Sequence, residues 1–516
     1  MPQPQLGIGA LVILLAYLLG ALLLGFWAMR RKRDHSARDY FLGSKLTGTI
    51  ILFFTMQATQ YSGNAFFGFT GMAYRSGLIW ILAVPLVCLI ITTQISFAPR
   101  LYILSKKYDY ITPTDYYADR FNSRAMRLLV ALFSIISMFP YLMIQTEATG
   151  HAFVGLTSGR FPFWSGVVFI SAVMLIYVVM GGWRGVVWTD TLQGIMLTIA
   201  IVAAAGVFLS TAGGFREVLD YTLKTAPEKL SAPDSYRTLT SSWLSLLIVS
   251  GIGFAMYPQA IQKIYAARSE RALKRSLMVM VLVPFIIGTC TLLIGMAGWK
   301  RLPGLKGTDS DQIFALLLNT VIGEHYWLVI FILCGVLAAI MSTSSSVVLT
   351  LASIFTKDIY QAFIVRKADE KQLAHAGRVF AIIILALVVL ASVKPTTTLW
   401  RLTEIKIEFL MQLFPPLILG LYWRRFSKWP ALVGLLAGSG LVAALMLMGL
   451  QRWWYFQAGL YGFVLNLAIC IVMGFLIKVG QEEEERVSSR FFDLFSLPPK
   501  TVNATAPVSI HTSLSR

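Results

Sequence analysis

Long apolar stretches without charged residues recur along the whole chain. A helix needs about 20 residues to cross the hydrocarbon core of a bilayer. The stretches that reach this length are 6–29, 77–98, 161–183, 238–262, 276–299, 326–356, 429–451 and 453–477. Shorter or interrupted stretches are 45–68, 128–147, 187–208, 379–393 and 401–423. Backbone groups in lipid have to form their hydrogen bonds within each segment, so the pattern predicts an all-α polytopic membrane protein with about 13 transmembrane helices.

Composition supports this assignment. Of the 516 residues, 57% are hydrophobic and 13% are charged, whereas soluble globular proteins carry about 25% charged residues. Lys and Arg number 44 against 25 Asp and Glu, which gives a net charge of +19. Most of the basic residues, including the run at 30–33, fall in connections that would lie in the cytoplasm. This positive-inside bias predicts an external N-terminus and a cytoplasmic C-terminus, and it explains the charge without a nucleic-acid partner.

Two interruptions of the apolar spans occupy matching positions in the series. One is the polar run 57–64, and the other, five spans further on, is the group Gly251, Gly253 and Pro258. Proline removes a backbone donor and opens a helix. Two broken helices of opposite direction, at equivalent places in two five-helix sets, are typical of transporters built from inverted repeats. Close helix packing through small residues is the alternative explanation for either interruption alone.

This symmetry divides the chain into five segments. The predicted boundaries are 1–38 for the first transmembrane helix and its basic segment, 39–236 for the first repeat with an external loop, 237–428 for the second repeat, 429–478 for two further transmembrane helices and 479–516 for a cytoplasmic tail.

A run of five hydroxyl residues, 342–346, lies deep in a predicted span. On a helix, Ala339, Ser342 and Ser346 share a face, as do Ser342, Ser345 and Ser346. Hydroxyl oxygens gathered on one stripe suit a hard cation such as sodium. Each hydroxyl alone could instead bond the carbonyl one turn back. Five in succession favour cation binding.

Asp190 is a carboxylate inside a span, shortly after Arg184. A charged group at membrane depth is costly and usually has a function or a partner. A structural ion pair with Arg184, or a hydrogen bond at a helix end, is the alternative to a functional role.

At these residues the chain resembles the sodium:solute symporter family, over about 39–425, as a bacterial-type member. The stretches that carry the resemblance are DYFLG at 39–43, the interrupted segment at 58–68, GGWRGVVWTDTLQG at 181–194, Pro258 with YAARS at 265–269, AAIMSTSSS at 338–346 with KDIY at 357–360, and LGLYWRR at 419–425. The resemblance implies a leucine-transporter-type core of two inverted five-helix repeats.

The resemblance also implies the sodium sites. Backbone carbonyls and two hydroxyls form the principal site, which by motif match is Ala58, Tyr61, Ala339, Ser342 and Thr343. Some members bind a second sodium, and the residues that match that pattern are Asp190, Ser342, Ser345 and Ser346. Lys263 departs from the family, in which Arg is more common at this place.

The solute of this family binds at the midplane, between the broken helices and their neighbours. The candidates implied here are Gln60, Ser62, Gly63, Tyr141, Gln145, Tyr257 and Gln259. Ordinary interhelical hydrogen bonding is the alternative role for most of them. Glu147 and Lys406 are charges within spans, for which we expect an external salt bridge or snorkelling, or, for Lys406, attraction of a carboxylate. Asn64 occupies the neighbourhood of a sugar-type carboxylate, which favours an organic acid or amino acid over a sugar.

Together these features predict a sodium-coupled secondary active symporter that imports a small organic solute by alternating access. We expect it in the bacterial-type inner or plasma membrane, with lipid around it and sodium as its only cofactor. A proton-coupled or sodium-independent carrier on the same fold, a membrane solute sensor and a channel are the alternatives. The sequence contains no nucleophile–base constellation or metal-ligand set, so we do not expect an enzyme.

Overall fold

Helices form most of the chain in the computed structural model, which describes residues 8–30, 42, 47–156, 161–231, 236–394 and 398–496. The DYFLG stretch at 39–43 lies almost entirely outside the described residues, as do most of the basic run at 30–33 and the tail beyond 496. The orientation of the termini and the five segment boundaries stay predictions.

The first half of the chain begins with the separate helix α1, Ile8–Arg30. The elements that follow are α3 Thr49–Gln60, α4 Gly63–Phe66, α5 Gly68–Ser76, η2 Gly77–Leu82, α6 Ala83–Lys107, α7 Pro113–Phe121, α8 Arg124–Leu156, α9 Phe163–Thr211, α10 Gly214–Thr225 and η3 Pro227–Lys229.

The second half repeats this arrangement and adds a C-terminal hairpin. Its elements are α11 Tyr236–Ala255, α12 Pro258–Ala266, α13 Glu270–Met280, α14 Val283–Arg301, η4 Gly307–Gln312, α15 Ile313–Val321, α16 Tyr326–Ile354, η5 Phe355–Ile364, α17 Glu370–Ser392, α18 Leu399–Leu410, η6 Met411–Leu413 and α19 Phe414–Tyr422. The C-terminal elements are α20 Lys428–Leu447, β1 Arg452–Trp453, β2 Phe456–Gln457, α21 Ala458–Leu476, α22 Gln481–Val487, η7 Ser488–Phe492 and α23 Asp493–Ser496.

Each predicted span overlaps at least one helix. Within the described ranges, 9 helices are long and apolar enough to cross a membrane, or 10 if α11 and α12, which meet at 48°, form one span. The number of about 13 therefore stays a prediction. The predicted spans 161–183 and 187–208 both lie along α9, which has a kink at Gly182, near the end of the first span, with φ 56° and ψ −167°. Glycine, which has no Cβ, adopts this conformation without the steric cost that other residues meet.

The two interruptions are real breaks, and they lie at the centre of the molecule. The first falls at Tyr61 and Ser62, between α3 and α4, inside the polar run that predicted it. Ser62 begins α4 by accepting a hydrogen bond from the Asn64 backbone at 3.2 Å. The second falls at Met256 and Tyr257. Pro258 then starts α12, where its missing N–H costs no helical bond.

Gly251 and Gly253 were predicted as weak points of the second broken helix, and this prediction is wrong because both lie inside α11. Their role is close packing. A Cβ on Gly253 would lie 2.5 Å from the carbonyl oxygen of Ile407, and one on Gly251 would lie 2.5 Å from the side chain of Leu89. The small residues therefore let α11 approach α18 and α6.

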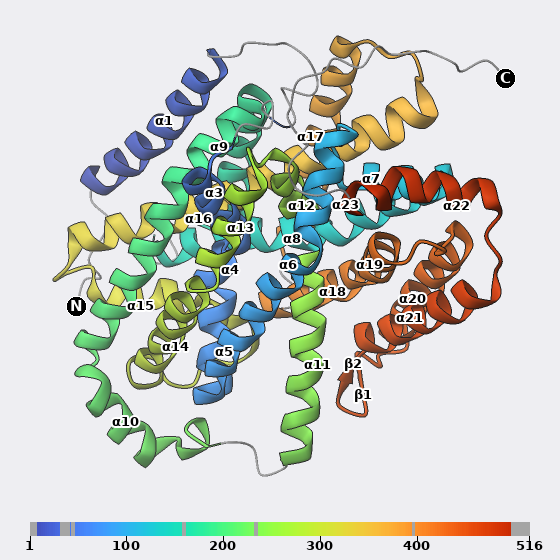
Figure 1. Ribbon diagram of the computed structural model, residues 1–516. Coiled ribbons are helices and arrows are strands. Elements are labelled where there is room, and N and C mark those ends of the chain that lie inside the picture. Colours follow the sequence, from blue (N-terminus) through green and yellow to red (C-terminus); the bar gives the residue numbers. More distant parts are fainter. Residues whose placement is uncertain are drawn as a thin grey trace.

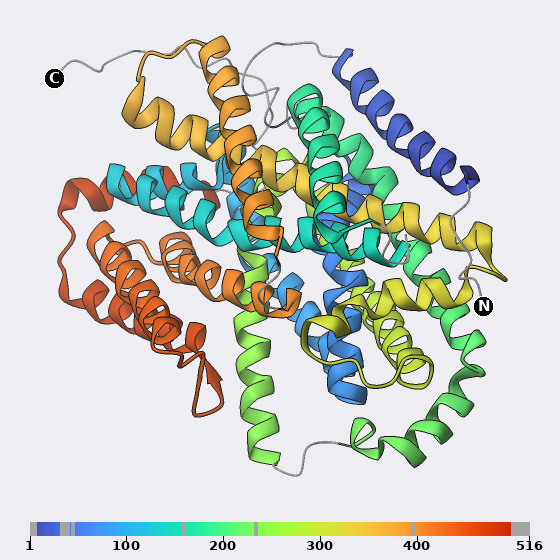
Figure 2. The same ribbon diagram turned by 180° about the vertical axis from the view of Figure 1, so that it is seen from behind.

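The broken helices run in opposite directions. In Figure 1 the chain descends from α3 to α5 and ascends from α11 to α12. Helix α16 crosses the centre of the molecule and packs on α9, α8 and α3, while α18 packs on α8 and α11. Outside this core, α1 and the α20–α21 hairpin lie on opposite sides (Figures 1 and 2). Two helices near the breaks, α16 and α18, thus face the unwound segments.

Candidate functional site

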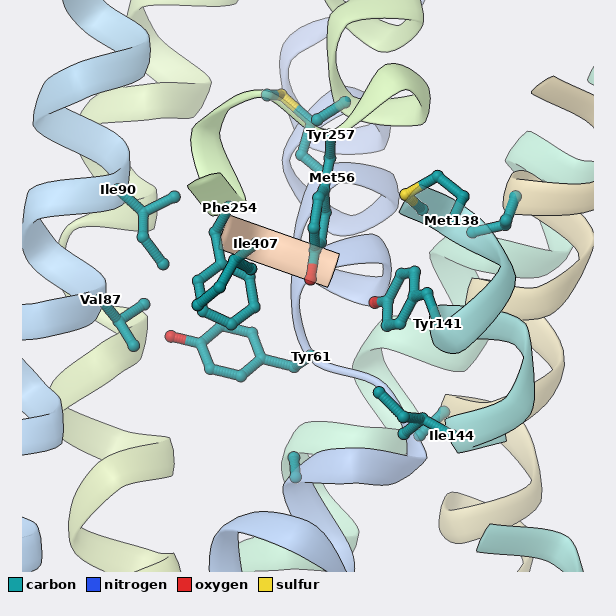
Figure 3. Packing of buried hydrophobic residues seen from close by; sticks show 14 of the residues in the cluster. Met56, Tyr61, Val87, Ile90, Met138, Tyr141, Ile144, Phe254, Tyr257 and Ile407 are labelled. Atoms are coloured by element: carbon teal, nitrogen blue, oxygen red, sulfur yellow. The ribbon is translucent and has the colours of Figure 1, made fainter. Parts of the chain in front are cut away.

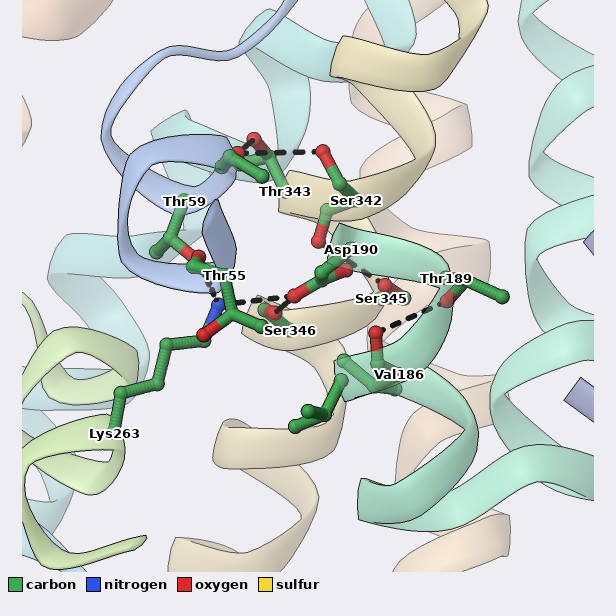
Figure 4. A network of polar contacts seen from close by, with 12 residues as sticks. Thr55, Thr59, Val186, Thr189, Asp190, Lys263, Ser342, Thr343, Ser345 and Ser346 are labelled. Carbon is green, nitrogen blue, oxygen red and sulfur yellow. Dashed lines mark hydrogen bonds and ion pairs between the residues drawn. The ribbon is translucent and has the colours of Figure 1, made fainter. Parts of the chain in front are cut away.

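The break in α3 leaves the carbonyl oxygen of Ala58 available to another helix. The last helical bond of α3 joins the Tyr61 N–H to the Gln57 carbonyl at 2.9 Å, after which the backbone of Tyr61 is extended. The next carbonyl, that of Ala58, accepts hydrogen bonds from hydroxyls of α16 instead of from its own helix. Thr343 donates to Ala58 O at 2.9 Å and Ser342 at 3.3 Å (Figure 4).

The principal sodium set comes together at this point. Ser342 Oγ also lies 3.1 Å from the carbonyl oxygen of Ala339, so two carbonyls and two hydroxyls from α3 and α16 share one small volume. Ala58, Ala339, Ser342 and Thr343 are all fully buried. Tyr61 stands at the break itself, one turn beyond Ala58. A hydroxyl can rotate and present its lone pairs, so all four oxygens can coordinate a cation, and hard cations prefer such oxygen ligands.

The second predicted set is only partly assembled. Asp190, on α9, accepts a hydrogen bond from Ser346 at 2.9 Å. Ser345 donates instead to the Ser342 carbonyl at 3.1 Å. The other partner of Asp190 is Lys263 of α12, whose Nζ lies 3.0 Å from the same carboxylate oxygen (Figure 4). The second set stays a prediction.

The ammonium of Lys263 also binds the broken helix α3. It donates to the Thr55 carbonyl at 2.6 Å and to the Thr59 hydroxyl. Lys263 and Asp190 are both fully buried. Of the two roles expected for Asp190, the structure therefore contains an ion pair, with Lys263 as the partner where Arg184 was expected.

A small cavity lies between the two breaks. Its lining residues are Gln60, Tyr61, Ser62, Asn64, Ala65, Phe69, Tyr141, Phe254, Tyr257 and Lys406. Aromatic side chains form much of its wall (Figure 3), and the rings of Tyr141 and Tyr257 lie 5.0 Å apart between centroids. Beyond Phe69, the ring centroids of Trp80 and Trp400 lie 5.5 and 6.0 Å from that of Phe69.

Four of the solute candidates line this cavity: Gln60, Ser62, Tyr141 and Tyr257. The other three do not. Gln145 supports the first break instead, because its Oε1 accepts from the Gly63 N–H and its Nε2 donates to Ser62 Oγ, both at 3.2 Å. Gln259 is buried beside the second break, and neither amide atom has a partner among the described residues.

Sequence reasoning missed part of the wall. Ala65, Phe69 and Phe254 line the cavity, but apolar residues in a span carry no signal that separates a cavity wall from core packing. Asn64, noted in the sequence for its bearing on a sugar, also lines the cavity. Lys406 was noticed as a charge within a span. The expected salt bridge or snorkelling is not what the described residues show, because its side chain is 1% exposed and its Nζ lies 3.4 Å from the centroid of the Tyr141 ring. Glu147 is also 1% exposed.

Comparison with known proteins agrees with this geometry. The sodium:solute symporter family model matches residues 40–438. The chain is 26% identical over 485 residues to the osmoregulated proline transporter OpuE of Bacillus subtilis, covering 92% of this chain and 96% of OpuE. It is 27% identical to the sodium/pantothenate symporter of Escherichia coli, covering 85% of this chain and 90% of the relative.

Solved structures with the same architecture include a sodium-coupled sialic acid symporter in a substrate-bound, outward-open state. It superposes with a TM-score of 0.74 at 22% identity, covering 91% of this chain and 98% of the symporter. The nucleobase–cation symporter Mhp1 in a closed conformation gives a TM-score of 0.56 at 15% identity, covering 89% of this chain and 99% of Mhp1. Both likenesses concern the fold. With the leucine-transporter-type fold and a family match over most of its length, the chain belongs to the sodium:solute symporter family of multi-pass membrane transporters and is not an enzyme.

Proposed function

We propose that the protein is a sodium-coupled symporter that imports a small organic solute across the cell membrane by alternating access. The observation that carries this proposal is the meeting of Ala58 O, Ala339 O, Ser342 Oγ and Thr343 Oγ1 at the break in α3. Two of these oxygens are backbone carbonyl oxygens and two are side-chain hydroxyl oxygens. They join α3 to α16, so a cation bound there stabilises one relative arrangement of the two helices.

Sodium and solute are coupled in this proposal because their sites share the same broken helix. The cation would bind Ala58 on one side of the break, and the solute would bind Ser62 on the other, four residues away. Sodium binding that favours the outward-open arrangement raises the affinity for solute by the same free energy with which the solute raises the affinity for sodium. Rocking of the helices around this fixed centre then exposes both to the cytoplasm.

The relatives support the choice of an organic acid or amino acid over a sugar. The proline transporter OpuE and the sodium/pantothenate symporter are named for solutes that carry a carboxylate.

Uptake into proteoliposomes tests this function. An imposed inward sodium gradient should drive accumulation of the solute, and replacement of external sodium by choline should abolish it. A protonophore added in sodium buffer should leave the initial rate unchanged. Uptake that persists in choline and collapses with the protonophore would instead identify a proton-coupled carrier.

A further inference from the structure

Lys406 brings a positive charge to the wall of the solute cavity, and no negative group accompanies it there. Its side chain is 1% exposed. The rings of Tyr141, Tyr257 and Phe254 lie around the ammonium, with centroids at 3.4, 4.9 and 5.3 Å from Nζ. Among the described residues, none forms a hydrogen bond or ion pair with this ammonium, and no carboxylate lines the cavity.

The two glutamates nearest in sequence serve other partners. Glu404 binds Arg452 at 2.8 Å, and Glu408 accepts from the backbone N–H of Gly459 at 2.8 Å. On a helix, positions 404 and 408 share a face, whereas 406 is turned about 200° away from each. The charge of Lys406 is therefore not neutralised along its own helix.

An ammonium has three N–H donors and no acceptor. Aromatic faces attract it, but they supply neither a full negative charge nor a strong hydrogen-bond acceptor. A desolvated charge without a partner is costly, and the cavity beside it is where a partner can enter. The cavity wall also contains polar groups that have no partner within the described part of the chain, namely both amide atoms of Gln60 and the hydroxyls of Tyr61 and Tyr257.

We propose that the solute is a small monocarboxylate anion and that its carboxylate binds the ammonium of Lys406. This inference rests on the proposed symport and names the class of its solute. A zwitterionic amino acid fits less well, because its own ammonium would find no carboxylate in the cavity wall.

Solute-induced stabilisation of the purified protein in sodium buffer tests this class. The probes are propionate, pyruvate and L-lactate, the matched neutral amides of these acids, and the zwitterions L-alanine and L-proline. We expect at least one acid to raise the unfolding temperature. Its neutral amide should bind with an affinity lower by about tenfold or more, as expected for the loss of a charged hydrogen bond. Lys406→Met should weaken the acid by a similar factor, and Lys406→Arg should retain it. Lys394→Met removes an exposed lysine and is the matched control.

Three outcomes would overturn the proposal: no acid of the panel binds, a neutral or zwitterionic probe binds in preference to the acids, or Lys406→Met binds the acid like the wild type. Stabilisation by sodium without solute is measured in parallel and reports on the sodium site separately. If sodium has no effect while an acid still binds through Lys406, the coupling proposal fails and the assignment of Lys406 stands.

Lys263 supports a second and independent inference. Its ammonium holds three oxygens, those of Asp190, Thr55 and Thr59. Ser346 donates to the same Asp190 oxygen. The Asp190 carboxylate, the charged member of the predicted second-sodium set, is thus already paired with a cation that belongs to the chain. A sodium ion added at this place would put two cations beside one buried carboxylate.

We infer that Lys263 replaces a second sodium ion and that one sodium accompanies each solute. This inference also rests on the proposed symport. Equilibrium binding of radioactive sodium to the purified protein, which needs no solute, tests it. The wild type should bind about one sodium per chain, and Lys263→Met should bind about two, because Asp190 then lacks its cation. Lys274→Met removes an exposed lysine on α13 and should bind about one.

The double variant Lys263→Met with Asp190→Asn removes both charges of the pair. It leaves no unpaired buried carboxylate, so it provides a second test if the single variant does not fold. It should bind about one sodium, like the wild type. A wild type that binds two sodium ions would overturn the inference, as would a folded Lys263→Met variant that still binds one. A wild type that binds no sodium would instead count against the proposed sodium coupling.

Discussion

The hydroxyl oxygen of Thr343 lies 2.9 Å from the carbonyl oxygen of Ala58, which joins the middle of α16 to the broken end of α3. This contact replaces a helical hydrogen bond that α3 loses at its break. A hydroxyl that serves this purpose can turn from donor to cation ligand, because its hydrogen rotates freely. The break thus creates both the structural need for Thr343 and the oxygen cluster that we assign to sodium.

Gln145 is expected to stabilise the first break. Its amide binds the Gly63 N–H and Ser62 Oγ, so Gln145→Leu leaves a buried donor unpaired at a cost of about 1–3 kcal/mol. We expect a lower unfolding temperature and weaker sodium binding. Gln94→Leu is the control, because Gln94 is equally buried and both its amide atoms lack partners among the described residues. Equal effects of the two variants would contradict a specific role for Gln145.

Gly253 is expected to tolerate no side chain. A Cβ there would lie 2.5 Å from the Ile407 carbonyl, so Gly253→Ala should push α11 from α18 and cost about 1–3 kcal/mol. Gly440→Ala, on α20, has open space around its Cβ and should leave stability unchanged or raise it slightly. Thermal unfolding in detergent measures both. A Gly253→Ala protein as stable as the wild type would show that α11 and α18 can separate freely.

Asp115, on α7 outside the spans, gives a pH-dependent contribution to stability. Burial raises the pKa of this carboxyl, but the ammonium of Lys357 at 2.6 Å and the N–H groups of Ile111 and Thr112 outweigh burial and lower the pKa below its usual value. A lowered pKa in the folded state stabilises the fold above the unfolded value of about 3.9, and the contribution is lost as the pH falls through the folded-state pKa.

Asp115→Asn should therefore lower the unfolding temperature at neutral pH and have a smaller effect in acid. Unfolding of wild type and variant is compared in one detergent at about pH 7 and about pH 2, below the unfolded-state pKa. A difference that grows as the pH falls would contradict the expected sign.

The two inferences about Lys406 and Lys263 combine into a prediction about charge. One sodium ion and one monocarboxylate anion together carry no net charge, so import should not respond to membrane potential. If two sodium ions moved, each cycle would carry one net charge, which is worth about 2.3 kcal/mol at 100 mV. Potassium gradients with valinomycin, imposed on proteoliposomes at fixed sodium, separate these cases. Uptake that rises steeply with an inside-negative potential would contradict electroneutral transport.

The helical fold and the position of the first break follow from local sequence. Apolar spans predict helices, and the polar run at 57–64 contains the break at Tyr61 and Ser62. For the second break, Pro258 was the informative residue, whereas Gly251 and Gly253 misled because glycine both weakens helices and permits close packing. Only the neighbouring helix distinguishes these two uses.

The site was predictable where one motif supplies the ligands and obscure where distant segments meet. Ser342 and Thr343 stand out as neighbours in a hydroxyl run. The partner of Asp190 does not stand out in the sequence. Lys263 is 73 residues away from Asp190, and it comes close because α12 packs on α3. Lys406 was visible as a charge in a span, but its ring of aromatic neighbours comes from α8 and α11 and the break after it.

The most direct test of the sodium site compares sodium binding by wild type, Ser342→Ala with Thr343→Ala, and Ser344→Ala. The double variant removes both hydroxyls that bind Ala58 O. Ser344 donates to the Ile340 carbonyl of its own helix at 2.7 Å and is the matched control. We predict that the double variant needs at least about tenfold more sodium for half-maximal binding, while Ser344→Ala binds sodium like the wild type. A double variant with wild-type sodium affinity would contradict the assigned site.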